Sequence, residues 1–362
     1  MKKVMIYAYA NFNLGDDLFI KVLCERYPNT KFYIYAPKQY KVLFKGMDNL
    51  SIVSSDTIFS RGINYIFRKL EYDNVIPLLI SKYCDAVINI GGSIFIQNKN
   101  WRKNLKTRRM LRNGNKPFFL LGANFGPFTD EEFYTNYRKE ISEYTDVCFR
   151  DEYSYGLFKD LGNVRLADDI IFQLKKQELN KTDNANSILI SVIEPSFRKN
   201  LEGYDEVYYN KLKDISLYFI KRGYKVLLMS FCKNEGDERA VKKIMDLIPK
   251  DKLSMVTKHE YRENIDDALN AITNTTAVIA TRFHSMILGW VFNKPVFPIT
   301  YSGKMKNVIK DVGFKGNYTD FNSISSLNPE DVFKFIETNK IDVSRQIKKS
   351  MEHFKVLDKY LS

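Results

Sequence analysis

Several patterns that would point to a particular chemistry are missing from this chain. The four cysteines, Cys24, Cys84, Cys148 and Cys232, are scattered without a CxxC pair, and only three histidines occur. There is no HExxH motif, no GxSxG motif and no clustered Cys and His ligands. Zinc hydrolysis and serine-esterase chemistry therefore lack support, and we expect no metal or other cofactor. Cysteines placed in this way are typical of reduced, buried thiols in a cytoplasmic protein.

Long apolar runs are also missing. No stretch approaches the roughly 18 apolar residues that a membrane-spanning helix needs. The start, Met1 to Tyr9, is too short, and too polar after Ala10, to be a signal peptide, and it resembles a first strand instead. These features predict a cytoplasmic protein without a membrane span.

The composition is that of a globular protein with an excess of positive charge. Hydrophobic residues make up 44% of the chain and charged residues 27%, and the formal net charge is +13. A chain of 362 residues is expected to form two domains. Nucleic acid would match the charge, but no helix-turn-helix, zinc-ligand or RNP pattern is present, so we expect no nucleic-acid partner. Anionic substrates or peripheral contact with an anionic membrane at its inner face explain the charge with fewer assumptions.

The first half of the chain alternates strands and helices, which indicates βα units and a mostly parallel sheet. A helix is expected from Leu18 to Arg26. The strands are expected at Lys3 to Ala10, Lys31 to Ala36, Asp85 to Ile90, Pro117 to Gly122 and Val147 to Phe149.

A polar stretch from Lys175 to Ser187 interrupts the pattern and is predicted to be an interdomain linker. A second alternation follows it, with strands at Ile188 to Ile193, Lys225 to Phe231, Leu253 to Val256, Ala277 to Ala280 and Val296 to Thr300. We predict an α/β protein with two doubly wound, Rossmann-like domains facing a cleft. The predicted domains are residues 1–178 and 187–342, and a helix of residues 343–362 is expected to pack back on the first domain.

The stretch Ala277 to Gly289 is the most informative part of the chain. A short apolar strand is followed by Arg282 and His284, and a helix is expected to start near Ser285. In open α/β sheets, ligands bind at the carboxyl ends of strands, where helix N-termini leave backbone N–H groups free for an anion. The alternative is structural: His284 would be a half-buried histidine bonded to a loop, and Arg282 a salt-bridge partner.

Three other strand ends carry candidate residues. After the first strand, Asn13, Gly15 and Asp16 lie in a polar turn that could present backbone N–H groups to a ligand, although any βα connection uses such residues. Gly91-Gly92-Ser93 would let backbone approach a substrate closely, but it is a weak signal for a nucleotide. Arg150 precedes Asp151, a good helix cap, and is the better candidate for anion binding.

Two further segments have a structural and a functional interpretation. The basic run from Lys99 to Arg112, which contains Trp101, is read first as a solvated helix face and second as a site for acidic lipid or a polymer carrier. The segment Ile336 to Leu361 has an apolar stripe typical of a surface helix packed on a core, formed by Ile347, Met351, Phe354, Leu357 and Leu361.

Taken together, the motifs resemble those of the polysaccharide pyruvyl transferase family. The resemblance runs from about Ile6 to Gly313 and rests on the order and spacing of short motifs rather than on any one of them. Where many members have Asp-Glu, this chain has Asp16-Asp17, which keeps the charge. The motifs are Asn13-Leu14-Gly15-Asp16, Asp85 to Ser93, Gly122 to Pro127, Arg150 to Ser154, Ala167-Asp168-Asp169, Arg282-Phe283-His284-Ser285 and Ser302-Gly303-Lys304.

The resemblance implies a two-domain, GT-B-like fold and transfer of pyruvate from phosphoenolpyruvate to a sugar as a ketal, in the synthesis of capsule, exopolysaccharide or cell-wall polymer. By position, Arg150 corresponds to a family arginine near the donor, and Arg282 and His284 to the strongest motif. The first domain would be the acceptor side and the second the donor side. Phosphoenolpyruvate needs cationic or N–H-rich anchors, which Arg150, Arg282 and Ser285 would supply, and His284 would relay protons.

Two other function classes stay open on the sequence alone. A GT-B glycosyltransferase would use the same architecture with a nucleotide-sugar donor, and a non-catalytic module for acidic polysaccharide would also fit the charge. The acceptor, a sugar or a lipid-linked oligosaccharide, is not identified by the sequence.

Overall fold

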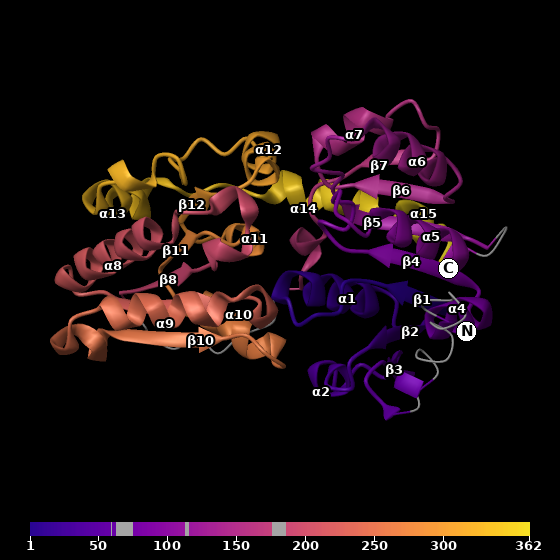
Figure 1. Cartoon of the computed structure of the whole chain (residues 1–362), viewed down its shortest axis with the longest axis horizontal. Helices are drawn as coiled ribbons and strands as arrows, with labels where there is room; N and C mark the ends of the chain where they lie inside the picture. The colour runs from indigo at the N-terminus through magenta and orange to yellow at the C-terminus, as the bar shows by residue number, and fades with distance from the viewer. Residues whose placement is uncertain (59, 63–74, 113–115, 176–185) are drawn as a thin grey trace. The chain divides into compact units, whose positions relative to one another are not determined.

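The computed structural model describes residues 1–58, 60–62, 75–112, 116–175 and 186–362. By its internal contacts the chain divides into two compact units (Figure 1). The first comprises Met1–Asn11, Asp16–Gln173 and Gln346–Ser362, and the second comprises Phe12–Gly15 and Leu174–Arg345. Most of the predicted linker, residues 176–185, lies outside the described residues.

The first unit is built on a seven-stranded sheet in the order β3-β2-β1-β4-β5-β6-β7. Every neighbouring pair of strands is parallel. The strands are β1 (Lys3–Tyr7), β2 (Lys31–Ala36), β3 (Leu50–Ser54), β4 (Ala86–Ile90), β5 (Phe118–Ala123), β6 (Asp146–Phe149) and β7 (Val164–Leu166).

Helices cover both faces of this sheet (Figure 1). On one face, Val87 and Phe118 pack with Leu105, Phe133 and Phe158 from the helices in a buried cluster. On the other face, Phe119 contacts Tyr360, because successive strand residues point to opposite sides. Before the chain passes to the second unit, the helices among the described residues are α1 (Leu14–Arg26), α2 (Tyr40–Leu43), α4 (Val75–Tyr83), α5 (Trp101–Arg112), α6 (Glu131–Ser142) and α7 (Glu152–Phe158), with a 3₁₀ turn η1 (Ile170–Gln173).

The end of the chain packs on the first unit. It forms α14 (Ser344–Ser350), the 3₁₀ turn η7 (Met351–Phe354) and α15 (Lys355–Leu361) instead of one continuous helix. Gln173 donates to the Ile347 carbonyl at 2.6 Å, and Arg26 pairs with Asp358 at 2.6 Å. Because the helix is broken, the predicted apolar stripe is not continuous, and Met351 is exposed.

The second unit has a six-stranded parallel sheet in the order β10-β9-β8-β11-β12-β13. Its strands are β8 (Ser187–Ser191), β9 (Lys225–Ser230), β10 (Val256–Glu260), β11 (Ala277–Ala280), β12 (Val296–Thr300) and β13 (Thr319–Asp320). Its helices are α8 (Asp205–Lys221), α9 (Asp237–Leu247), α10 (Ile265–Thr273), α11 (Phe283–Val291), α12 (Gly303–Asp311) and α13 (Pro329–Thr338), and 3₁₀ turns lie at Pro195–Phe197, Lys199–Leu201, Lys233–Glu235, Lys250–Met255 and Ile324–Ser326.

Each sheet reverses its strand order once. In the first unit the reversal lies between β1 and β4, and in the second it lies between β8 and β11. Ligands of doubly wound sheets bind outside the carboxyl ends of the strands at such a point. The predicted α/β class with two doubly wound domains is therefore confirmed, while the cleft expected between the domains stays a prediction.

Several predicted boundaries needed correction. Helix α1 begins at Leu14, not Leu18, because the Asn13 side chain accepts from the Gly15 N–H at 3.1 Å and Asp16 and Asp17 favour the first helical turn. The predicted strand Leu253 to Val256 is mostly a 3₁₀ turn, and β10 starts at Val256. Strand β3 was missed, because its residues are all half-exposed and give no apolar run.

No helix in the described part of the chain combines the length and the apolar character needed to cross a bilayer.

His353 in η7 provides a test of how the end of the chain packs. Its side chain is fully buried, its Nε2 donates to the Asp168 carbonyl at 2.8 Å, and burial lowers its pKa to about 3. An unfolded histidine has a pKa of about 6.5, so between these values the unfolded chain binds the extra proton. Stability should therefore fall as the pH drops through 6.5, by about 2 kcal/mol at about pH 5 from this residue.

The variant His353→Gln keeps an N–H donor but cannot take up the proton. It should be less stable than the native protein at neutral pH and lose less stability on acidification. Urea unfolding of both proteins at neutral pH and at about pH 5 measures the difference. Equal pH dependence in the two proteins would contradict the burial of a neutral imidazole.

Candidate functional site

The first unit gathers polar residues at the carboxyl ends of β4, β5 and β6. Arg150, directly after β6, donates to Asp169 at 2.8 Å and to Asn124 at 2.7 Å. Ser93 donates to the same Asn124 oxygen at 3.1 Å. A Cβ atom on Gly92 would lie 2.5 Å from Nη2 of Arg150, so the guanidinium lies directly against the backbone of the turn.

The same turn is bordered by the start of α1. A Cβ atom on Gly91, whose φ is +149°, would lie 3.7 Å from a carboxylate oxygen of Asp16. The predicted residues Asp16, Gly91, Gly92, Ser93 and Arg150 are therefore brought together in one cluster. The Arg150 side chain is only 2% exposed and is paired with Asp169, so its geometry supports the turn, and a direct contact with a ligand stays a prediction.

The second unit has a corresponding cluster at the carboxyl ends of β9 and β11. Arg282, which precedes the first turn of α11, binds both oxygens of Asp237 through Nε and Nη2, and its Nη1 donates to Glu235 at 2.5 Å. Burial alone would lower the pKa of Arg282, but Asp237 and Glu235 raise it well above its ordinary value. Arg282 is thus a permanently charged salt-bridge partner, which is the structural alternative that the sequence left open.

Asn13 and Gly15 lie in this second cluster. The segment Phe12–Gly15 groups with the second unit, where Leu14 donates to the Phe231 carbonyl at 3.1 Å and Asn13 donates to Glu235 at 3.4 Å. A Cβ atom on Gly15 would lie 1.6 Å from Nδ1 of His284 and would overlap the ring. Only glycine fits at this position, and its backbone holds the half-buried imidazole in place.

The second cluster contains more cations than the sequence suggested. Arg198 donates to Glu235 at 2.7 Å and lies 5.0 Å from the centre of the Tyr301 ring. Lys304, in the first turn of α12, lies 5.3 Å from the Phe283 ring. Burial would raise the pKa of the Tyr301 phenol, but Lys304, Arg198 and Arg282 together bring that pKa below its ordinary value. The local potential is therefore positive.

Two buried hydroxyls belong to the helix starts of this cluster. Among the described residues, the structure gives no hydrogen-bond partner to Oγ of Ser285 in α11 or to Oγ of Ser302, which precedes α12. Buried hydroxyl groups usually have a partner, so both can bond to a ligand or to water. With His284 and the three cations, they form a site suited to an anion that undergoes proton transfer.

Comparison with known proteins identifies the family. The family model described as polysaccharide pyruvyl transferase matches residues 13–303. The chain belongs to this family. The match includes Arg150, Arg282 and His284. Among named proteins, amylovoran biosynthesis protein AmsJ of Erwinia amylovora is 24% identical over 297 residues, which cover 76% of this chain and 71% of AmsJ.

Solved structures show how this pyruvyl transferase family member is folded. The UDP-GlcNAc 2-epimerase of Neisseria meningitidis has a TM-score of 0.62 at 11% identity and covers 100% of this chain and 99% of its own. The ADP-heptose LPS heptosyltransferase II of E. coli has a TM-score of 0.52 at 15% identity, with 92% and 97% covered. At these identities the likeness shows the fold alone, which is GT-B-like as predicted.

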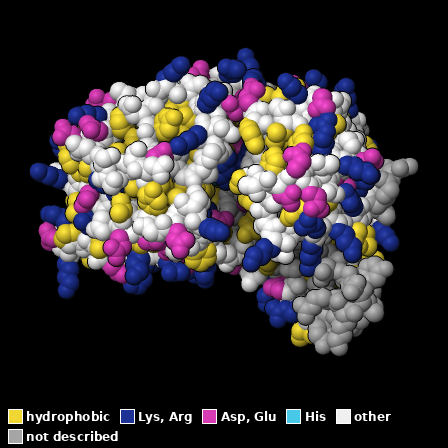
Figure 2. All heavy atoms as spheres, turned by 45° about the horizontal axis from the view of Figure 1, so that its top comes forward, with side chains coloured by type: hydrophobic (Ala, Val, Ile, Leu, Met, Phe, Trp, Pro, Cys, Tyr) yellow, Lys and Arg dark blue, Asp and Glu magenta, His cyan; other side chains and the backbone are white. Residues whose placement is uncertain are grey.

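The predicted basic segment of this family member proved to be largely paired. Arg108 is buried and donates to Asn89 at 3.0 Å. On α5, Arg102 pairs with Glu132, and Arg109 donates to Glu140 at 3.0 Å. On the face that Figure 2 shows, Lys and Arg side chains are dispersed among Asp and Glu. Since α6 neutralises much of α5, this segment adds little support for the predicted contact with an anionic membrane.

The sequence did not single out Arg198, Glu235, Asp237 and Tyr301 as site residues. One signal was available for Asp237: it begins α9, the helix after β9, as Arg282 precedes α11, the helix after β11, and the two strands flank β8 in the sheet. Arg198 lies in a loop of 3₁₀ turns after β8, which no apolar period marks.

The contact between Gly92 and Arg150 predicts that Gly92→Ala destabilises the first unit. The added methyl group would lie 2.5 Å from a guanidinium that is held by Asp169 and Asn124 and cannot move freely. We expect a loss of about 1–3 kcal/mol in the free energy of unfolding, measured with urea. The control is Gly156→Ala in α7, where nothing lies within 4 Å and alanine favours the helix. Equal stability of the two variants would refute the close contact.

Proposed function

We propose that this protein transfers a pyruvyl group from phosphoenolpyruvate to a sugar of a cell-surface polysaccharide or its precursor, forming a ketal. The observation that carries the proposal is the family match over residues 13–303, which includes His284 and the turns that hold it. The likeness to AmsJ, whose name refers to amylovoran biosynthesis, supports an exopolysaccharide as the context. The second unit is the donor side in this proposal, and the first unit is the acceptor side.

In this reaction one proton is donated to C3 of phosphoenolpyruvate, and one proton is removed from each of two sugar hydroxyls. Protonation of C3 of phosphoenolpyruvate produces an oxocarbenium-like centre at C2. A sugar hydroxyl adds to C2 and loses its proton, and a second hydroxyl of the same sugar then displaces phosphate as it loses its own proton. The products are the cyclic ketal and inorganic phosphate, so atoms and charge balance without an oxidant or reductant.

The second cluster offers groups for each part of this chemistry. Phosphate and carboxylate would be bound by Arg198 and Lys304, and by Arg282 where its Nη1 exchanges Glu235 for the donor. The pair of Arg282 with Asp237 would stay intact and hold the guanidinium in place. The N-terminus of α11 and the Ser285 hydroxyl would add uncharged donors. His284, held against Gly15, would relay the protons. Arg150 would act within the first unit, where its pairing with Asp169 holds the turn at Gly92.

A glycosyltransferase is the second candidate, because the fold is shared with enzymes such as the heptosyltransferase. The two functions differ in their donor. Phosphoenolpyruvate, but not a nucleotide diphosphate-sugar, should raise the melting temperature of the purified protein. The reverse result would favour the glycosyltransferase.

We further propose a cytoplasmic location, with any contact to the inner membrane face weak enough to be released by high salt.

If His284 relays protons, His284→Gln should lower turnover by roughly 10² to 10⁴-fold while the fold and donor binding remain. His259→Gln, at a histidine of β10 in the same unit, is the matched control and should leave turnover near the native value. Phosphate release from phosphoenolpyruvate and mass spectrometry of the ketal measure turnover, and a thermal shift with phosphoenolpyruvate measures donor binding.

Two results would count against this role. A His284→Gln protein with native turnover and a lower melting temperature would make the histidine a loop anchor only. Loss of donor binding together with turnover would make it a ligand of the donor rather than a relay.

The proposed chemistry uses no metal or other cofactor. Activity should therefore persist after dialysis against EDTA, with phosphate release unchanged within error. Loss of activity on chelation, restored by one divalent metal ion, would show that a metal takes part in binding or catalysis.

A further inference from the structure

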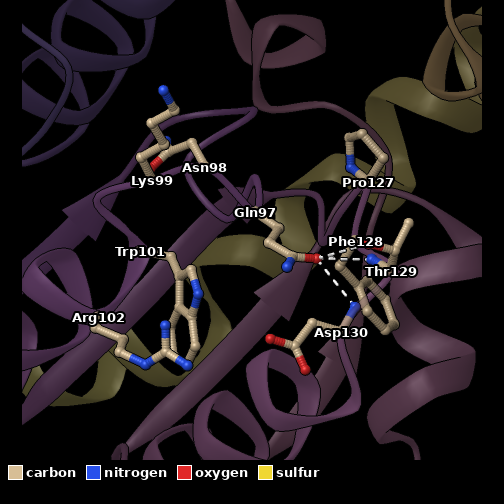
Figure 3. A pocket seen from close by; sticks show the side chains of 9 residues that line it. All are labelled: Gln97, Asn98, Lys99, Trp101, Arg102, Pro127, Phe128, Thr129 and Asp130. Carbon is tan, nitrogen blue, oxygen red and sulfur yellow. Dashed lines mark hydrogen bonds between the residues drawn. The ribbon is translucent and has the colours of Figure 1, made fainter.

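We infer that a pocket of the first unit, between the loops after β4 and β5, binds an uncharged hexose residue of the acceptor glycan. The pocket has a volume of about 520 Å³ and is lined by residues that include Gln97, Lys99, Trp101, Arg102, Phe128 and Asp130 (Figure 3). This volume lies within the range of small-molecule sites. The role of the sugar as acceptor rests on the proposed function, whereas the binding itself does not.

Both loops are held in place by backbone pairing that continues the sheet. Gly126 donates to the Phe95 carbonyl at 2.8 Å, and Gln97 donates to the Pro127 carbonyl at 3.1 Å. Phe95 and Phe125 form an isolated parallel bridge, and their rings are stacked. The pocket is therefore preorganised at the carboxyl edge of the sheet, which limits the entropy lost on binding.

The orientation of Gln97 follows from its hydrogen bonds. Its side-chain oxygen accepts from the backbone N–H of Thr129 at 2.7 Å and of Asp130 at 3.1 Å. The amide nitrogen must then point the other way, and in Figure 3 it lies on the side of Trp101 and Asp130. Among the described residues no group accepts from this nitrogen, so two N–H donors are available to a ligand.

Asp130 provides the complementary acceptor. One of its oxygens accepts from the Glu132 N–H at 2.9 Å and caps α6, and the structure gives the other oxygen no partner in the described part of the chain. Adjacent hydroxyls of a sugar ring both donate and accept hydrogen bonds. A pair of N–H donors on one side and a carboxylate oxygen on the other therefore matches a vicinal diol.

The remaining lining explains why the ligand should be an uncharged sugar. Lys99 and Arg102 are balanced by Asp130 and by Glu132, which pairs with Arg102, so the pocket carries no net excess of charge for an anion. Phe128, which is partly buried, supplies apolar surface for the C–H face of a ring, and the buried Trp101 forms the base of the pocket. Trp101 is held by the guanidinium of Arg102 at 4.3 Å and by an edge contact with Phe133 at 5.4 Å.

The test is binding of the methyl glycosides of glucose, galactose, mannose and N-acetylglucosamine, measured by saturation-transfer NMR without phosphoenolpyruvate. We expect at least one to bind. Asp130→Asn keeps the helix cap and should weaken that binding about tenfold, since a hydrogen bond to a charged group is lost. Gln97→Glu keeps the oxygen that the loop needs and removes the two donors, with a similar effect.

The matched control is Asp342→Asn. Asp342 accepts from the N–H two residues ahead, Ser344, at 2.9 Å, as Asp130 does from Glu132, but it lies in the second unit. This control should bind like the native protein. Binding of none of the four glycosides, or equal binding by native protein and both pocket variants, would overturn the inference.

The outcome is separable from that of the proposed function. A native protein that forms the ketal from phosphoenolpyruvate, with pocket variants that bind and react normally, would refute the pocket alone. Glycoside binding that the pocket variants lose, without phosphate release from phosphoenolpyruvate, would support the pocket and refute the pyruvyl transfer.

Discussion

The buried ion pair between Arg282 and Asp237 is the interaction on which the second unit's site depends. Asp237 is fully buried, and besides Arg282 it accepts the backbone N–H groups of Phe231 and Cys232 at 3.0 Å each. One carboxylate thus joins the ends of β9 and β11 and sets the start of α11. Removal of one partner from such a pair typically costs about 3–5 kcal/mol, because the other charge stays buried. His284 lies where it does because this pair fixes the turn before it.

In the first unit, a different buried ion pair fixes the turn at the site. Arg150 directly follows β6, and its charge is met by Asp169 from the loop after β7. In both units a buried arginine at a strand end holds a turn. In each cluster the backbone of a glycine lies directly against a side chain: Gly92 against Arg150, and Gly15 against His284. Such preorganised turns are what a site needs to place reacting groups without reorganisation.

The two polar sites differ in their balance of charge. The cluster around Tyr301 has more cations than carboxylates, and the Tyr301 pKa is lowered accordingly despite burial. The pocket beside Trp101 is balanced in charge and offers paired donors and acceptors. For the proposed function, this difference would separate an anionic donor from an uncharged sugar acceptor, since charge complementarity affects which partner binds as well as how tightly.

The sequence by itself determined the architecture and the residues at the strand ends. Apolar runs such as Ala277–Ala280 and Val296–Thr300 predicted strands correctly. A parallel strand is buried on both faces, so its local sequence is a continuous apolar run that identifies it without knowledge of its neighbours in the sheet. Motif order also placed His284 beside a helix start. Only the tertiary structure decided what these residues contact. Asp237 and Arg282 are far apart in the chain, and their pairing depends on β9 and β11 lying on either side of β8. The same holds for the pocket, since Gln97 can only orient its amide once the loop at Thr129 and Asp130 lies beside it. Periodicity reports which face of an element is buried, whereas hydrogen-bond partners across strands depend on sheet order, which no local pattern specifies.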